Sequence, residues 1–174
     1  MAIIFFLIKK EHSMYKTSTL SVQGLMTELM RFTEQGMTGP FVVCVYDALY
    51  NPHDALAAKN IIEMFPNVDI RVAIMAGNTS GALLIAAAVE EDKRYLTSQG
   101  VFAFTSPDFV GHGAYKDLNN AAVAQTELRE RMNQILDKAF NLPRTSEEMH
   151  KEKELPRAPE VMKFGFRPLE ELTA

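Results

Sequence analysis

The most informative stretch of the sequence is MAGNTSGA, residues 75–82. Residues 69–75, which are mainly apolar, predict a strand before it, and the small and aliphatic residues after it predict a helix. A turn containing Gly77 therefore leads from the strand to a helix that begins at Ser80. Backbone N–H groups and the helix dipole at that position favour developing negative charge, as acyl transfer requires. Serine is also a preferred N-cap residue, so a purely structural role for Ser80 is the alternative.

Strands and helices alternate on both sides of this stretch. Short, mainly apolar segments predict strands at residues 3–8, 41–46, 69–75, 94–96 and 101–105. Apolar residues at helical spacing predict helices at residues 20–32, 54–65, 80–89 and 119–140, the first of them capped by Thr17, Ser18 or Thr19. Residues 106–116 are expected to form a loop or irregular arm. This alternation, with short connections, predicts an α/β fold with a largely parallel sheet.

Length and composition are those of an ordinary globular protein. The chain has 174 residues, 47% hydrophobic and 23% charged, so a single ordered domain is expected. The net charge of −4 argues against nucleic acid as the main partner. Cys44 is the single cysteine, and the sequence offers no disulfide framework, metal site or cofactor motif. No apolar run approaches the ~20 residues of a membrane span or resembles a signal peptide, so a cytoplasmic protein without membrane contact is expected.

A serine nucleophile needs a base, and the sequence holds four histidines. They are His12, His53, His112 and His150. None lies in a recognisable motif, and each is expected to be a solvated surface residue. The charged run at residues 147–154, which contains His150, is expected to be a solvated helix face with pairs four residues apart such as Glu147 with Lys151.

Several motifs in order resemble those of the ClpP family, the proteolytic subunits of the Clp protease. Family members have a strand, then MGQAASMGA with the nucleophilic serine, then an alanine-rich helix ending in Lys-Arg. Here MAGNTSGA leads without a gap to Lys93-Arg94, and Ser80 takes the position of the nucleophile. Arg131-Met132-Asn133 matches a segment of the family's long handle helix, and residues 158–165 resemble its closing Ala-Pro-Glu motif. The resemblance is firmest over residues 69–132.

The resemblance implies a ClpP/crotonase-like α/β fold of repeated β-β-α units with a protruding handle helix. Residues 1–174 would form a single domain, with a head of about 1–105 and 141–174 and a handle arm and helix of about 106–140. It also implies subunits that assemble into rings, possible stacking of rings through the handle helices, and an AAA+ unfoldase as a possible partner. The apolar residues of the long helix are compatible with such assembly.

The sequence departs from the family at its catalytic positions. The histidine base is replaced by Thr105, whose hydroxyl cannot accept a proton at neutral pH as imidazole does. The oxyanion loop corresponds to residues 47–51, which lack both family glycines. The triad aspartate falls in residues 151–154, where no aspartate is present and Glu152 or Glu154 could lie nearby. The axial N-terminal loops that serve the unfoldase are expected to be missing.

The leading hypothesis is a catalytically degenerate ClpP-like serine protease homologue. It would act as a ring-forming structural or regulatory subunit, as a homo-oligomer or together with a ClpP paralogue. The alternative is an active ATP-dependent Clp-type peptidase or hydrolase that uses Ser80 with a non-standard base: His150, His112 or a lysine. A crotonase-like acyl-CoA enzyme is a weaker third hypothesis, because no glycine after residues 41–46 helps to form an oxyanion hole.

Overall fold

The computed structural model describes residues 3–8, 14–15, 19–45, 52–75, 78–98, 102–103, 115–154 and 156–172. Within these residues the largest sheet has seven strands, in the order β2-β1-β4-β5-β7-β9 with β3 also paired to β1. Its strands are β1 (Ile3–Ile8), β2 (Met14–Tyr15), β3 (Thr19–Leu20), β4 (Phe41–Val45), β5 (Ile70–Ile74), β7 (Arg94–Leu96) and β9 (Arg167–Pro168). A separate pair is formed by β6 (Asn78–Thr79) and β8 (Phe102–Ala103).

The sheet is mixed, because β4, β5, β7 and β9 run parallel whereas β1 is antiparallel to β2, β3 and β4. The expected α/β fold with a largely parallel sheet is thus found from β4 onward, and β1 is the strand that runs antiparallel to its neighbours. The reason lies in β2 and β3, which pair back along β1 and return the chain to the start of that strand. The helix at residues 22–34 then carries the chain back to the other end of β1. Strand β4 therefore runs antiparallel to β1.

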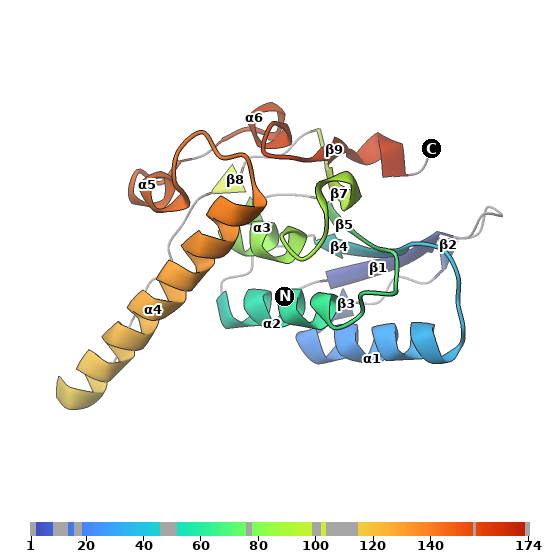
Figure 1. Ribbon diagram of the computed structural model, residues 1–174, viewed down its shortest axis with the longest axis horizontal. Helices are drawn as coiled ribbons and strands as arrows, with labels where there is room; N and C mark the ends of the chain where they lie inside the picture. Colours follow the sequence, from blue (N-terminus) through green and yellow to red (C-terminus); the bar gives the residue numbers. More distant parts are fainter. Residues whose placement is uncertain are drawn as a thin grey trace.

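The helices are α1 (Val22–Glu34), α2 (Pro52–Glu63), α3 (Ser80–Ala86), α4 (Tyr115–Ala139), α5 (Ser146–Lys151) and α6 (Ala158–Met162), with 3₁₀ turns η1 (Glu91–Lys93) and η2 (Leu169–Leu172). Helices α1 and α2 lie side by side below the sheet in Figure 1, and α3 lies between the sheet and the upper end of α4. The rest of α4 projects away from the body of the molecule (Figure 1). Strand β5 with β6 and α3, and β7 with β8 and α4, form two successive β-β-α units.

Helix boundaries differ from those expected, most clearly at the starts of α1 and α4 and at the end of α3. Ser21, rather than a residue at 17–19, caps α1 by accepting from the N–H of Gly24 at 3.2 Å, because Thr19 and Leu20 pair with β1. Helix α4 begins at Tyr115, inside the stretch expected to be irregular. Helix α3 ends at Ala86, since the N–H groups of Ala88 and Val89 bond to carbonyls three residues back and tighten the chain into a turn.

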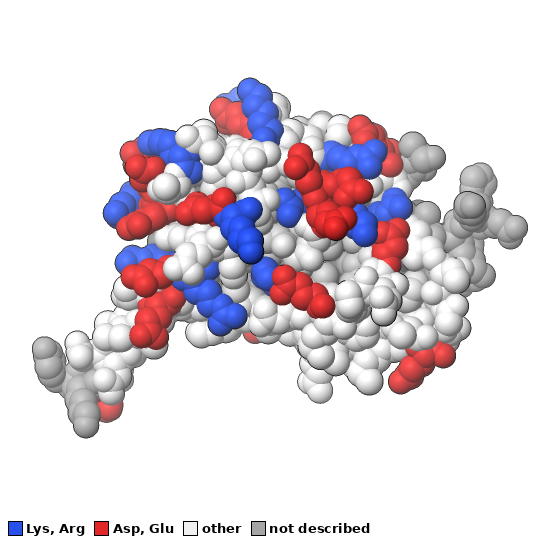
Figure 2. Space-filling model, in the orientation of Figure 1, with Lys and Arg blue, Asp and Glu red and all other residues white. Residues whose placement is uncertain are grey.

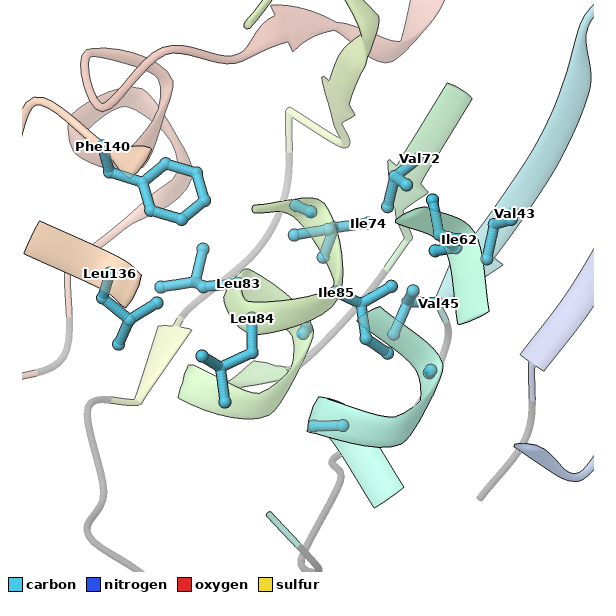
Figure 3. Close-up of a cluster of buried hydrophobic side chains, with 14 of the residues drawn as sticks. Val43, Val45, Ile62, Val72, Ile74, Leu83, Leu84, Ile85, Leu136 and Phe140 are labelled. Atoms are coloured by element: carbon cyan, nitrogen blue, oxygen red, sulfur yellow. The ribbon is translucent and has the colours of Figure 1, made fainter. Parts of the chain in front are cut away.

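The core lies between the sheet, α2, α3 and the base of α4. Residues 82–86 of α3 are all buried, as expected of a helix that is apolar on every side. Figure 3 shows Leu83 directed toward Leu136 and Phe140, and Ile85 directed toward Val45 of the sheet. Burying one such side chain contributes about 1.5–3 kcal/mol. These contacts fix the place of α3, and with it the backbone of its first residue, Ser80.

Candidate active site

Ser80 is the first residue of α3, so the strand before it and the helix that begins at it are as expected. The expected turn at residues 76–79 is wrong for Asn78 and Thr79, which form β6 by pairing with β8, and residues 76–77 lie outside the described residues. Strand β5 ends at Ile74, and the N–H of Met75 continues the pairing by donating to the carbonyl of Val45 at 2.9 Å. Strand β6 follows and leads directly into α3. Ser80 therefore follows the carboxyl end of a central parallel strand, the edge at which α/β sheets place ligands.

The small β6–β8 sheet joins the two segments that hold the expected catalytic positions. Its strands are parallel, with Asn78 opposite Phe102 and Thr79 opposite Ala103. In sequence, Ser80 follows β6 directly and Thr105 comes shortly after β8. Thr105 itself lies outside the described residues, as do His12, His112 and the oxyanion-loop positions 47–51. The side chain of Ser80 is likewise outside them.

His150 is buried, so the expectation of a solvated surface histidine is wrong for this residue. It is 5% exposed, and its Nδ1 lies 3.0 Å from Oδ1 of Asn133 on α4. Burial is the main cause that lowers the pKa of His150 from its ordinary value of 6.5. The buried residues Ser146, Met149 and His150 share one face of α5, and this helical spacing was the sequence signal for burial. The partner, Asn133, belongs to the Arg-Met-Asn segment of the handle helix. His53, in contrast, is exposed on α2, as expected.

The two glutamates closest to the expected third triad position are both engaged by Arg144. Its Nη1 lies 2.8 Å from Oε2 of Glu152, and its Nη2 pairs with Oε1 of Glu154. The expected pair of Glu147 with Lys151 is confirmed at 2.8 Å. The carboxylates after α5 are therefore partners of a guanidinium on the molecular surface, where an ion pair contributes about 0–1 kcal/mol.

Arg94 of the Lys-Arg motif, on β7, is buried and joins this strand to the end of α4. Its Nη1 donates to the carbonyl oxygen of Ala139 at 2.6 Å, and its Nε and Nη2 donate to that of Val89 at 2.9 and 2.7 Å. Desolvation lowers the pKa of the guanidinium, although Glu91 opposes this effect. The sequence marked Arg94 as part of a motif, and the structure gives it a structural role at the base of α4.

A cavity of about 470 Å³ lies away from Ser80, where the chain leaves α4 and passes through α5 and α6. Pro143, Met149, Pro156 and Phe164 give it apolar walls, and Lys163 lies at its edge together with glutamates. Among the described residues that line it, none belongs to β5, β6 or α3, and one is Glu154, which Arg144 engages.

Charged side chains of both signs are mixed over the face shown in Figure 2, including the upper part of α4, α5 and the C-terminal elements. Within the residues that the structure describes, no helix is both long and apolar enough to span a bilayer. Across the same ranges, His, Cys, Asp and Glu side chains do not gather in threes as a metal ion would require.

The sheet, the β-β-α units and the projecting α4 define a mixed α/β fold of the ClpP/crotonase type. Among solved structures, the chain is similar to a mutant of ClpP1 from Listeria monocytogenes, with a TM-score of 0.63. The match covers 83% of this chain and 80% of that chain at 13% sequence identity, so it shows a shared fold. No protein-family model matches the sequence. No curated protein matches it either.

Proposed function

We propose that this chain is a ClpP-like serine protease homologue with a degenerate catalytic centre. It acts as a ring-forming structural or regulatory subunit, in a homo-oligomer or together with a ClpP paralogue. In this proposal residues 1–174 form one domain, with a head of about 1–105 and 141–174 and a handle of about 106–140. The shared fold and the chemistry of the catalytic positions support it.

The exposed outer half of α4 is the observation that carries the assembly part of the proposal. The inner half is anchored by Leu128, Met132 and Leu136, whereas no described side chain from Asp117 to Glu127 is buried. Val123 is 51% exposed. Helices in water depend on packing of their apolar side chains for most of their stability, so a helix that projects this far favours a partner outside the chain.

The catalytic part of the proposal rests on residue chemistry. Ser80 is retained, but Thr105 stands where the family has its base, and residues 47–51 lack the glycines that turn N–H groups toward an oxyanion. Glu152 and Glu154 are held by Arg144. Loss of one triad member alone lowers the rate by orders of magnitude. Ordinary peptidase activity is therefore not expected.

Native mass spectrometry of the full chain tests the assembly, alone and after mixing with a catalytically active ClpP. We expect a discrete oligomer in at least one of the two samples, and Val123→Glu should shift it toward monomer by placing a charge in the helix contact. Gln23→Glu is the matched control, since it adds the same charge at an exposed position of α1. A monomer in both samples, or an unchanged oligomer in Val123→Glu, would contradict the proposal.

A second candidate function is hydrolysis by Ser80 with a non-standard base. The β6–β8 pairing favours it, because it keeps the segment that leads to Ser80 beside the segment that leads to Thr105. Labelling of the purified protein with a fluorophosphonate probe, compared between wild type and Ser80→Ala, distinguishes the two functions. Labelling that depends on Ser80 would establish an activated nucleophile, and the bases to replace next are His150, His112 and the lysines. Absence of labelling supports the degenerate centre.

A further inference from the structure

Helix α5 is attached to α4 by side chains that are both polar and buried. Nδ1 of His150 lies 3.0 Å from Oδ1 of Asn133. Ser146, one turn earlier on α5, donates from Oγ to the backbone carbonyl of Asn133 at 3.2 Å and from its N–H to Oδ1 of Asp137 at 2.7 Å. Because the amide oxygen of Asn133 can only accept, the ring nitrogen that faces it is the one that carries the proton.

We propose that His150 is a pH-sensitive latch, whose neutral ring holds α5 against α4 and whose protonation in mildly acidic solution releases α5 from α4. This inference is independent of the proposed function, because it concerns only the attachment of one helix to another within the chain.

The internal contacts of α5 make it a unit that can move as a whole. Thr145 and Glu148 form a capping box at its start, with the Thr145 Oγ1 accepting from the Glu148 N–H at 3.3 Å and Glu148 Oε2 accepting from the Thr145 N–H at 3.1 Å. Arg144, which precedes α5, forms ion pairs with Glu152 and Glu154, which follow it. These bonds do not involve α4. Release of α5 therefore breaks the contacts of Ser146 and His150 with α4 and exposes the side chain of Met149, which is fully buried while α5 is docked.

Charged groups on both helices act on the ring. On α4, the positive charge of Arg129 disfavours protonation of His150, and the negative charge of Asp137 favours it. On α5, Glu147 and Lys151 pair with each other at 2.8 Å. A hydrogen bond with the backbone of Ser146 also favours the protonated ring, but burial is the largest effect and keeps the pKa of His150 below 6.5.

The direction of the pH effect follows from this lowered pKa. In the released state the ring is in water, where its pKa returns to about 6.5. Below that pH the released state binds more protons than the docked state, so docking weakens as the pH falls toward the lower pKa of the docked ring. Within this window the equilibrium constant for release rises at most about tenfold per pH unit, and above about pH 7.5 it is constant.

Hydrogen exchange of the full chain, followed by mass spectrometry between pH 5 and 8, tests the latch. After correction for intrinsic exchange, protection of α5 should fall several-fold between pH 7 and 5.5 while protection of α2 stays constant. His150→Asn should remove this dependence. The side-chain amide nitrogen of asparagine is separated from Cα by the same number of bonds as Nδ1 of histidine, but the amide does not titrate. His53→Asn, at an exposed position of α2, is the matched control and should behave as wild type.

A second variant keeps the test decisive if His150→Asn does not fold. Asn133→Asp places a carboxylate against the ring, which stabilises the protonated form and should hold α5 in place to a lower pH than in wild type. Protection of α5 that does not change with pH in wild type would overturn the proposal. So would an unchanged pH dependence in His150→Asn, or release of Asn133→Asp at the same pH as wild type.

Discussion

Phe140, the residue directly after α4, stacks on Phe166 near the start of β9, with ring centroids 5.4 Å apart and ring planes 6° from parallel. The guanidinium of Arg94 also lies over the Phe140 ring, 4.6 Å from its centroid. The base of α4 is thus held by a group from β7 and by a ring from the C-terminal segment. The orientation of the projecting helix depends on these two contacts, which come from distant parts of the sequence.

Replacing Arg94 should destabilise the fold more than replacing an exposed arginine. Arg94→Met keeps much of the side-chain volume but leaves the carbonyls of Val89 and Ala139 without their donors, so we expect a loss of about 2–4 kcal/mol in the free energy of unfolding. Urea denaturation measures it. Arg31→Met is the control, since its pair with Glu28 is on the surface and should contribute less than about 1 kcal/mol. Equal losses in the two variants would contradict the role given to Arg94.

Two glycines with positive φ should respond differently to alanine. At Gly165, with φ of 105°, an added Cβ would lie 3.1 Å from Cγ and Cδ of Glu91, whereas at Gly36, with φ of 58°, it would meet nothing within 4 Å. We expect Gly36→Ala to lower the free energy of unfolding by about 1 kcal/mol and Gly165→Ala to lower it by more. Thermal denaturation of both variants checks the order, and the reverse order would show that Glu91 gives way freely.

The stability of the protein should fall in alkaline solution because of Cys44. Burial raises the pKa of this thiol to about 12, whereas in the unfolded chain it ionises near 8.5. The folded-state pKa is the higher one, so the stabilisation is complete below about pH 8.5 and is lost as the pH rises above it, by up to about 1.4 kcal/mol per pH unit. Urea denaturation at pH 8 and 10 should show the loss in wild type, and Cys44→Ala should lose less over the same interval.

Restoring the family's base should not restore peptidase activity. Thr105→His places an imidazole at the sequence position of the family's base, but residues 47–51 still lack the glycines of the oxyanion loop. Loss of one oxyanion donor alone lowers the rate by a factor of about 10²–10³. Hydrolysis of a fluorogenic peptide should stay at the level of Ser80→Ala. Turnover that requires both the new histidine and Ser80 would show that the loop at 47–51 supports catalysis.

Local sequence signals predicted the centre of the molecule and failed where a residue depends on a distant one. The apolar run at β4 predicted a buried strand correctly, because a strand buried on both faces is apolar throughout. The local pattern predicts Thr19 as a possible helix cap and Leu20 as helical, but the two residues form β3 by pairing with Ile3 and Ile4. The strand and helix propensities of individual residues do not indicate which distant residues will pair.

In the candidate site, too, the features with a local sequence signal could be predicted and those that depend on distant residues could not. The start of a helix at Ser80 follows from local pattern, and the structure has it. The burial of His150 depends on Asn133, and the bonds of Arg94 depend on Ala139, a residue 45 positions away. Neither contact has a local signal, although the helical spacing of Ser146, Met149 and His150 shows which face of α5 would need a partner.

Strand β9 has a consequence for the behaviour of the protein at high concentration. It closes one side of the described sheet, contains only Arg167 and Pro168, and both residues are exposed. An edge strand with free N–H and C=O groups is a template on which another chain can add a strand, the first step toward fibrils. Here the edge is short, carries a charge paired with Glu171, and ends in a residue without an N–H. Sheet growth from this side is therefore discouraged, and the protein is protected there against aggregation.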